Sequence, residues 1–439
     1  MGVELSVSTD TRSIKKDDLF FALKGPSFDA HDFLKEAVEK GASRLVISEE
    51  SKIPPGLRQK AQFIVVEDTL KAYGDWAAQH RATFKIPTIA ITGSSGKTTV
   101  KELTAHLLSA DLSVLKNQGT ENNLVGVPKT IFGLKSDHQV LVLEMGTNQP
   151  GEIDRLASLA QPEIGILTQI GYSHLQGLKD LAGVRAEKLS LLRHLKPGGV
   201  LIVNGEDPML ADVSYPQGRV IRVGFSKEKN EVVADALVLD ATGTSFVLNG
   251  EENFKTRLYG RHNVLNCLLA ITAAKELGIT VSSLRKSLET FQSVPGRLEF
   301  RNVDGLCFLN DSYNANPTSF KAALETLREF KSEGKRGVVC GDMLELGTEA
   351  ETLHRQAGNF LAGCGLDWVI AAGPLCKYLV EGALESGLDP KKIHHVKDSR
   401  EAGVLCRQLA VPGDTVLIKG SRGMKMEKVF ECFTTFYTR

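Results

Sequence analysis

The sequence has 439 residues, of which 42% are hydrophobic and 24% charged, as in an ordinary globular protein. Its 53 Lys and Arg residues are balanced by 53 Asp and Glu residues, so there is no excess of positive charge for nucleic acid or an anionic membrane surface. No apolar run is long enough to cross a bilayer and no signal-peptide pattern opens the chain, so we expect a cytoplasmic protein of roughly two to four domains.

Residues 1–85 form the first predicted unit, a small α/β domain that ends at the segment FKIP and has no glycine-rich phosphate loop. The next predicted unit, residues 86–294, alternates short apolar runs with helical segments. The runs are TIAITG, QVLVLEMG, EIGILTQIG and GVLIVNGED, and each ends in polar or glycine residues. This pattern indicates a parallel sheet buried on both faces.

Ligands of such sheets bind beyond the carboxyl ends of the strands. We therefore expect the polar strand ends to gather at one edge of the sheet. These are Gly93, Glu144, Thr168 and Asn204.

The same pattern returns in RGVVCGD, DWVIAAG and DTVLIKG, after the turn-like segment SVPGRLEF. We place a boundary near Pro295 and predict a Rossmann-like domain over residues 295–439. The predicted fold class is α/β, with three α/β domains of which the central one is a P-loop ATPase domain with a parallel sheet. The seven cysteines have no C-x-x-C pair, which indicates reduced thiols in a reducing compartment.

The segment ITGSSGKTTV is close to the phosphate-loop pattern G-x-x-x-x-G-K-[ST]. Gly96, Lys97 and Thr98 match its end, but Ile91 stands where the leading glycine is usual and Gly93 follows two residues later. A predicted strand precedes the segment and a predicted helix follows it, which is the context the motif requires. We expect backbone N–H groups to bind phosphates, the lysine to add a positive charge and Thr98 to bind Mg²⁺. An ordinary strand-to-helix turn is the alternative.

Glu144 and His174 each follow a predicted strand. A carboxylate at a strand end beside a phosphate loop can bind Mg²⁺, although Glu144 taken alone is better explained as a cap of the next helix. His174 lies in GYSHLQG. The residues alone leave metal binding and a structural role equally open for this histidine.

Lys188 lies in the middle of an apolar helical stripe in DLAGVRAEKLSLLRHL. The stripe consists of Leu181, Val184, Leu191, Leu192 and Leu195. A lysine at such a position must extend its head to solvent, pair with an acid or lose its charge. Carbamylation by CO₂ would convert it into a carboxylate able to bind Mg²⁺. From the residues alone, extension to solvent is the preferred interpretation.

The segment GRHNVLN opens a helix in which His262 and Asn266 share one face, with Asn263 beside them. Side-chain amides suit a purine edge, and helix capping by Asn263 is the alternative. Arg297 lies at the predicted domain boundary, and Asp311 follows the strand GLCFLN. Phosphate and ribose contacts are possible for these two residues, and so is an interdomain salt bridge.

Taken in chain order, the motifs resemble those of the Mur ligases, the ATP-dependent amide-forming enzymes of peptidoglycan synthesis. The matching segments are TGSSGKTT, NLVGVPKT, LEMG, SHLQG, GRHNVLN, PGRLE and NDSYNANPTS. The resemblance covers nearly the whole chain, and the family's phosphate loop has the shifted glycine seen at Gly93. STDTRSIKKDDLFFALKG, GDMLELG and KGSRGMKMEKV are similar to the branch that adds D-alanyl-D-alanine to a UDP-linked tripeptide.

The resemblance implies roles for the matching residues. The ATP phosphates would be bound by Gly93, Ser94, Ser95, Gly96, Lys97, Thr98 and Thr99. A first Mg²⁺ would be held by Thr98 and Glu144, and a second by His174 and carbamylated Lys188. Asn266 would contact adenine, Asp311 the ribose and Arg297 the γ-phosphate side. The catalytic set would be Lys97, Lys188, His174 and Arg297.

The resemblance also implies substrate contacts in all three domains. In the first domain, Asp10, Thr11 and Arg12, with the loop from Phe28 to His31, would hold the UDP-sugar. The peptide would be lined by Asn122 and Asn123. The third-domain part of the site would contain Tyr313, Asn314, Asn316, Lys419, Ser421 and Arg422.

The implied reaction is the ATP-dependent joining of D-alanyl-D-alanine to UDP-N-acetylmuramoyl tripeptide through an acyl phosphate, by a monomer with no nucleic-acid partner. One alternative is another amide ligase of the same superfamily, of folylpolyglutamate or cyanophycin type, although the DTR segment argues against it. The other alternative is a P-loop switch ATPase that acts through a protein partner.

Overall fold

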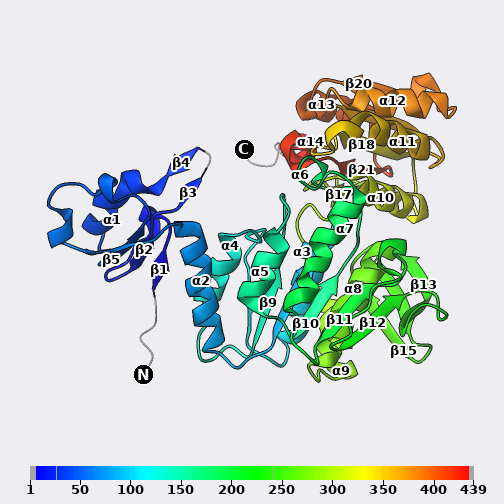
Figure 1. Cartoon of the computed structure of the whole chain (residues 1–439). Coiled ribbons are helices and arrows are strands. Elements are labelled where there is room, and N and C mark those ends of the chain that lie inside the picture. Colours follow the sequence, from blue (N-terminus) through cyan, green and yellow to red (C-terminus); the bar gives the residue numbers. More distant parts are fainter. Residues whose placement is uncertain (1–5, 26, 241, 435–439) are drawn as a thin grey trace.

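A computed structural model describes residues 6–25, 27–240 and 242–434. These residues form three separate β-sheets of four, nine and six strands, together with one two-stranded hairpin. The sheets follow one another along the chain and each is covered by helices, which confirms the predicted α/β class (Figure 1). The first unit lies to one side of the central unit, and the third unit lies above it.

The first unit is a parallel sheet in the order β1-β2-β5-β6. Its elements are β1 (Val7–Ser8), β2 (Leu19–Phe21), β3 (Lys24–Gly25), β4 (Phe28–Asp29), α1 (Leu34–Glu39), β5 (Arg44–Ile47) and β6 (Gln62–Val65). Helix α2 (Thr69–Ala82) begins where the Asp68 side chain accepts from two backbone N–H groups. It packs Tyr73 and Trp76 against Phe21 of this sheet and also contacts α4 and α5 of the central unit. The boundary near residue 85 stays a prediction.

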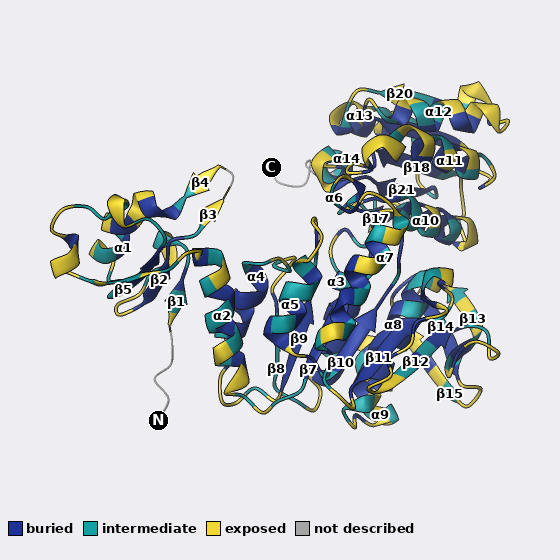
Figure 2. Ribbon diagram, viewed as in Figure 1, coloured by how far each residue is buried: buried dark blue, intermediate teal, exposed yellow. Residues whose placement is uncertain are grey.

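The central sheet has the order β15-β14-β13-β12-β11-β10-β7-β9-β8. It is parallel from β8 to β13 and antiparallel over β13, β14 and β15. Its strands are β7 (Thr88–Thr92), β8 (Val114–Lys116), β9 (Val140–Glu144), β10 (Ile164–Leu167), β11 (Val200–Asn204), β12 (Arg219–Gly224), β13 (Val232–Asp240), β14 (Gly243–Leu248) and β15 (Glu252–Thr256). Every residue of β7, β9, β10 and β11 is buried, as the apolar runs predict (Figure 2).

Helices cover both faces of the central sheet. They are α3 (Lys97–Leu108), α4 (Gly126–Phe132), α5 (Glu152–Ala160), α6 (Leu175–Leu178), α7 (Leu181–Leu189), α8 (Arg261–Glu276) and α9 (Val281–Thr290). One core joins Ile89 and Ile91 of β7 to α3, α8 and α9. The other joins Ala90 of the same strand to α4, α5 and α7. Because successive residues of β7 face opposite cores, neither face of the strand is exposed to solvent.

The third unit is a six-stranded sheet in the order β16-β17-β21-β18-β19-β20, with only β16 antiparallel to its neighbour. Its elements are β16 (Glu299–Val303), β17 (Leu306–Asp311), α10 (Pro317–Glu329), β18 (Arg336–Gly341), α11 (Ala350–Ala362), β19 (Trp368–Ala372), α12 (Cys376–Glu385), β20 (Ile393–Val396), α13 (Ser399–Leu409), β21 (Thr415–Lys419) and α14 (Glu427–Thr434). All seven cysteines are free thiols. Over the described ranges, no helix has both the length and the apolar composition needed to cross a membrane.

Helices α11 and α12 of the third unit pack against each other through glycines. A Cβ atom on Gly358 would lie 2.0 Å from the carbonyl oxygen of Leu379, and one on Gly382 would lie 2.2 Å from that of Arg355. Neither carbonyl can move without breaking its helix. The two helices therefore touch backbone to backbone, which no larger residue allows.

We predict that Gly358→Ala destabilises the third unit by about 1–3 kcal/mol, the usual cost of overpacking, and lowers its thermal transition by several degrees. Circular dichroism or scanning fluorimetry measures the transition. Gly363→Ala is the matched control, because that glycine has φ −81° and its Cβ would be 3.6 Å from the nearest atom. Equal thermal transition temperatures for the two variants would contradict the close packing of α11 on α12 at Gly358.

Candidate active site

A cleft of about 710 Å³ lies between the central and third units. The strand ends Glu144, Thr168 and Asn204 all line it, together with the loop after β7, as expected for the carboxyl edge of a parallel sheet. Of the residues implied by the resemblance, the lining includes Ser94, Ser95, Gly96, Lys97, Thr98, Thr99, Asn122, Asn123, Glu144, His174, Asn266, Arg297, Asp311, Tyr313, Asn314, Asn316, Lys419, Ser421 and Arg422.

The displaced glycine of the phosphate loop has a steric cause. A Cβ atom on Gly93 would lie 1.9 Å from Thr168 Oγ1, because the end of β10 passes directly beside the loop. Ile91, in contrast, lies inside the buried strand β7, where no glycine is needed. Gly96 has φ 82° and leaves no room for a Cβ next to Asn266. Each glycine therefore stands where the backbone of the loop leaves no space for a side chain. The first of them comes two residues later than the leading glycine of the common pattern.

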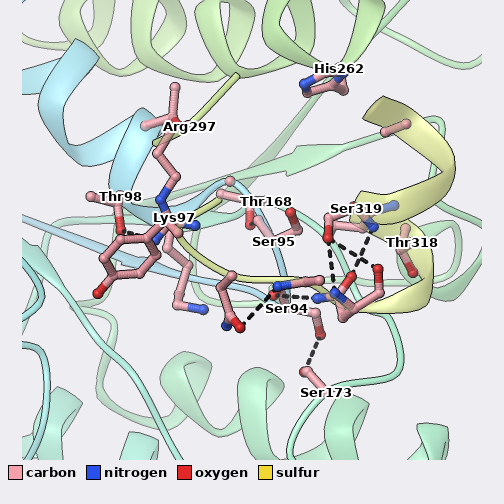
Figure 3. A pocket seen from close by; sticks show the side chains of 18 of the residues that line it. Ser94, Ser95, Lys97, Thr98, Thr168, Ser173, His262, Arg297, Thr318 and Ser319 are labelled. Atoms are coloured by element: carbon pink, nitrogen blue, oxygen red, sulfur yellow. Dashed lines mark hydrogen bonds between the residues drawn. The ribbon is translucent and has the colours of Figure 1, made fainter. Parts of the chain in front are cut away.

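Two cations face the phosphate loop. Lys97 Nζ donates to Gly93 O at 2.7 Å, and burial lowers the pKa of this lysine. Arg297 crosses from the third unit, and its Nη2 donates to Thr98 Oγ1 at 3.3 Å. Its buried Nε has no hydrogen-bond partner among the described residues. Figure 3 shows the three side chains grouped at one end of the cleft. Unfilled N–H donors beside a glycine-rich loop fit a polyphosphate.

Glu144 fits a role in binding a divalent cation. It is 1% exposed, and its Oε1 accepts from Thr98 Oγ1 at 3.2 Å and from Asn122 Nδ2 at 2.7 Å. Its Oε2 accepts no hydrogen bond from the described residues, although Lys101 Nζ lies 3.8 Å away. An unfilled carboxylate oxygen beside a threonine hydroxyl is the donor set that Mg²⁺ takes next to nucleotide phosphates.

Lys188 is 1% exposed, so the interpretation that its head extends to solvent is wrong. Helix α7 ends at Leu189, and the apolar stripe continues as a 3₁₀ turn over Ser190–His194. The carboxylate of the neighbouring Glu187 accepts hydrogen bonds from the backbone N–H groups of Gly151 and Ile153, so it already has partners other than Lys188. Burial lowers the pKa of Lys188 well below its usual value, and the charge of Lys97 lowers it further. Loss of its charge is thus the favoured alternative.

His174 is held by the third unit. Its Nδ1 lies 2.8 Å from Glu345 Oε2, which lowers the pKa of that carboxyl group. The backbone N–H of Leu175 donates to Glu345 O at 3.0 Å. In the part of the chain that the structure describes, no group of three or more His, Cys, Asp or Glu residues could hold a metal ion. An imidazole and an unmodified amine do not by themselves fit a second Mg²⁺.

The first turns of α8 also line the cleft, with Asn266 next to Gly96 of the phosphate loop. Asn266 Nδ2 donates to Asn263 Oδ1, and Asn263 Nδ2 donates to Tyr259 O. The side chain of Asn263 therefore binds the backbone just before α8, although the N-cap residue is Gly260. Burial lowers the pKa of His262 to about 4. The guanidinium of Arg261 stacks on Phe225 at 4.1 Å, and both line the cleft. We did not predict this stacked pair, because Phe225 has no signal in the sequence.

In the third unit, Asp311 and Lys419 form an ion pair between the ends of β17 and β21. Leu298 N donates to the other oxygen of Asp311 at 3.0 Å. The interdomain salt bridge considered for Asp311 is therefore wrong, because both partners of its ion pair belong to the third unit. Lys419 also donates to Asn314 O, and Ser421 donates to Ala315 O, so these predicted residues order the segment before α10.

Two further contacts join this segment to the central unit. Asn316 caps α10, and its Nδ2 donates to Ser94 O at 3.2 Å. The hydroxyl of Tyr313 donates to Thr120 Oγ1 at 3.0 Å. Thr120 was not predicted as a site residue, and the spacing of the sequence gives no signal for a contact across 193 positions.

The predicted UDP-sugar residues do not lie at the cleft. They belong to the first unit, and none of them lines the cleft; Figure 1 shows this unit to one side of the central unit. They are Asp10, Thr11, Arg12, Phe28 and His31. Phe28 is 54% exposed and stacks on Phe33. His31 is buried, with Ser48 N donating to its Nε2 and Asp29 next to its Nδ1. His31 therefore orders its own loop.

We predict that Gly93→Ala weakens nucleotide binding at least tenfold, because the added Cβ collides with Thr168 and displaces the loop. Titration calorimetry with ATP measures the affinity, and circular dichroism checks that the variant folds. Gly363→Ala serves as the control, because this glycine follows α11 and does not line the cleft. Unchanged affinity in a folded Gly93→Ala protein would exclude this loop as the nucleotide site.

Comparisons with known proteins agree with this geometry. Residues 91–274 match the family model of the Mur ligase middle domain, residues 296–422 that of the Mur ligase glutamate ligase domain and residues 6–81 that of the Mur ligase family catalytic domain. The UDP-N-acetylmuramoyl-tripeptide–D-alanyl-D-alanine ligase of Bacillus subtilis is 35% identical over 96% of this chain and 92% of its own length. The enzyme of that name from Escherichia coli is 34% identical over 97% and 92%.

Solved structures give the same result. The crystal structure of MurF from Acinetobacter baumannii has a TM-score of 0.89 and 31% identity, covering 98% of this chain and 93% of that one. MurF ligase from Thermotoga maritima in complex with ADP has a TM-score of 0.88 and 27% identity, covering 99% of each chain. The chain described here belongs to the Mur ligase family.

Proposed function

We propose that this chain is an ATP-dependent ligase that joins the amine of D-alanyl-D-alanine to the terminal carboxylate of UDP-N-acetylmuramoyl tripeptide. The products are the pentapeptide, ADP and phosphate. The observation that carries the proposal is the cleft, in which a phosphate loop and a polar edge of the third unit face each other. Relatives with this named activity align over more than nine-tenths of the chain.

In this proposal the three predicted domains have separate tasks. Residues 1–85 hold the UDP-sugar through Asp10, Thr11, Arg12 and the exposed ring of Phe28. Residues 86–294 bind ATP, with Asn266 at adenine, and Asn122 and Asn123 line the path of the peptide. Residues 295–439 close over the site.

The first chemical step forms an acyl phosphate. A carboxylate oxygen of the tripeptide attacks the γ-phosphorus of ATP, the bond to the β-phosphate oxygen breaks, and ADP leaves with the electron pair. Lys97 and Arg297 stabilise the charge that spreads over the transferring phosphoryl group. Thr98 and Glu144 would hold a Mg²⁺ ion that neutralises phosphate charge when bound. Asp311 would accept from a ribose hydroxyl, which requires it to share its carboxylate with Lys419.

The second step forms the amide. The amine nitrogen of D-alanyl-D-alanine attacks the acyl carbon, the carbon–oxygen bond to phosphate breaks, and the nitrogen loses a proton. An acyl phosphate is also open to attack by water, so the cleft has to be dry. Support comes from two contacts that hold the third unit on the central unit. Asn316 donates to Ser94 of the phosphate loop, and Tyr313 donates to Thr120 of the loop between β8 and α4. Asn314, Lys419, Ser421 and Arg422 would face the dipeptide.

We further propose that Lys188 is carbamylated. Its neutral amine attacks CO₂, and loss of one proton leaves a carbamate, which converts a buried base into a carboxylate. Burial favours this step because it lowers the pKa of Lys188 and so raises the share of neutral amine. The carbamate would complete a donor set for a second Mg²⁺ together with His174, which would have to offer Nε2 because its Nδ1 faces Glu345.

Phosphate release tests the reaction. We predict that turnover requires ATP, the UDP-linked tripeptide and D-alanyl-D-alanine together, because neither half-reaction alone recycles the enzyme. A coupled phosphate assay with each substrate omitted in turn measures this. Turnover with a folate in place of the tripeptide would support another amide ligase, and turnover with ATP alone would support a switch ATPase.

We predict that Lys188→Ala lowers kcat at least a hundredfold and that millimolar formate or acetate restores part of the activity, because a small carboxylate can occupy the space of the carbamate. Lys391→Ala, at an exposed lysine, is the control. Mass spectrometry of the intact protein under CO₂ trapping detects the modification itself. Full activity in Lys188→Ala, or no rescue and no added mass, would contradict carbamylation.

A further inference from the structure

Tyr313 occupies an unusual position beside two arginines. The guanidinium carbon of Arg297 lies 4.0 Å from the centre of its ring, and that of Arg422 lies 5.5 Å from it. The backbone N–H of Tyr313 donates to Gly296 O, directly before Arg297 in the chain. Ring and guanidinium are thus fixed to each other through both the backbone and the side chains.

The other end of Tyr313 is anchored to the central unit. Its hydroxyl donates to Thr120, which lies in the loop between β8 and α4. The fully buried Lys101 holds this loop by donating to Asn117 O at 3.0 Å and to Gly119 O at 2.7 Å. Lys101 belongs to α3, the helix that the phosphate loop opens. The Thr120 loop and the helix of the phosphate loop therefore together fix the position of the tyrosine ring.

Few direct contacts besides the ring fix the guanidinium of Arg297, although the carboxylates of Asp311 and Glu144 attract its charge. No salt bridge from Arg297 to a carboxylate is found among the described residues, and its one side-chain hydrogen bond goes to the Thr98 hydroxyl. An aromatic face attracts a guanidinium without using any of its N–H donors. A carboxylate partner would occupy those donors. The ring therefore holds the arginine while leaving its donors open for an anion.

We propose that Tyr313 is a positioning residue for Arg297. Its ring keeps the guanidinium over the phosphate loop with free donors, and its hydroxyl makes that placement depend on contact between the third unit and the Thr120 loop. This inference rests on the proposed function for the identity of the reaction. It departs from the substrate role that the resemblance implies for Tyr313.

The test compares Tyr313→Leu, which removes the aromatic face, with Tyr313→Phe, which keeps it. We expect Tyr313→Leu to lower kcat roughly 3–30-fold, the range for a desolvated cation–π contact, while KM for D-alanyl-D-alanine changes less than about twofold. Tyr313→Phe should recover most of that loss. Tyr378→Leu is the matched control, because Lys377 lies 4.5 Å from that ring outside the cleft.

Coupling to Arg297 is the decisive comparison. In an Arg297→Ala background, Tyr313→Leu should have almost no further effect, because the group it positions is gone. A second pair of variants tests the hydrogen bond from the Tyr313 hydroxyl to Thr120. Tyr313→Phe and Thr120→Val should lower kcat equally, and the double variant should lower it no further. Additive effects with Arg297→Ala, or a raised KM for the dipeptide at unchanged kcat, would overturn the proposal and assign Tyr313 to substrate binding.

A binding measurement keeps this test separate from the proposed reaction. Tyr313→Leu should weaken a non-hydrolysable ATP analogue several-fold more than it weakens ADP, because only the γ-phosphate reaches Arg297. The wild-type protein and Tyr378→Leu should give the same ratio of affinities. If wild-type turnover needs no dipeptide but the ratio still changes as expected, the proposed reaction fails while the positioning role stands. An unchanged ratio in a folded Tyr313→Leu protein would overturn the positioning role.

Discussion

Burial of the Glu144 carboxylate is the constraint on which the site depends. A carboxylate that is 1% exposed at the end of a central strand must be matched by donors and positive charge. Asn122, Thr98 and Lys101 provide them. Thr98 and Lys101 both belong to α3, the helix that the phosphate loop opens, and Thr98 also meets Arg297 of the third unit. Asn122 lies in the loop between β8 and α4, which Lys101 orders and Tyr313 contacts.

The third unit contacts the central unit at this site through polar groups. Arg297 meets Thr98, Asn316 meets Ser94 and Glu345 meets His174. Polar contacts of this kind allow two domains to separate. The proposed reaction needs such movement, because its three substrates must enter and its acyl phosphate must be enclosed. Glu345 has a consequence for the proposed second Mg²⁺ site. While its carboxylate faces Nδ1 of His174, only the other ring nitrogen can serve as a ligand.

Sequence patterns predicted the features that depend on local order. Apolar runs with polar ends located β7, β9, β10 and β11, and the edge where Glu144 and Thr168 meet follows from parallel pairing alone. The apolar stripe predicted that Lys188 starts from the core side of its helix, but we expected its head to extend to solvent, and this was wrong because the whole side chain is buried. The stripe also could not show that the Glu187 carboxylate already accepts from backbone N–H groups. Contacts such as Tyr313 to Thr120 depend on how two domains dock, and no local pattern encodes that.

The central claim is that the tripeptide carboxylate becomes an acyl phosphate in the cleft between Lys97 and Arg297. Oxygen transfer measures this. The UDP-linked tripeptide is labelled with ¹⁸O in its terminal carboxylate, and the phosphate released during ligation is analysed by mass spectrometry or ³¹P NMR. An acyl phosphate passes one labelled oxygen to the phosphate, because the carbon–oxygen bond breaks in the second step. Phosphate without label, released alongside the amide, would contradict the mechanism.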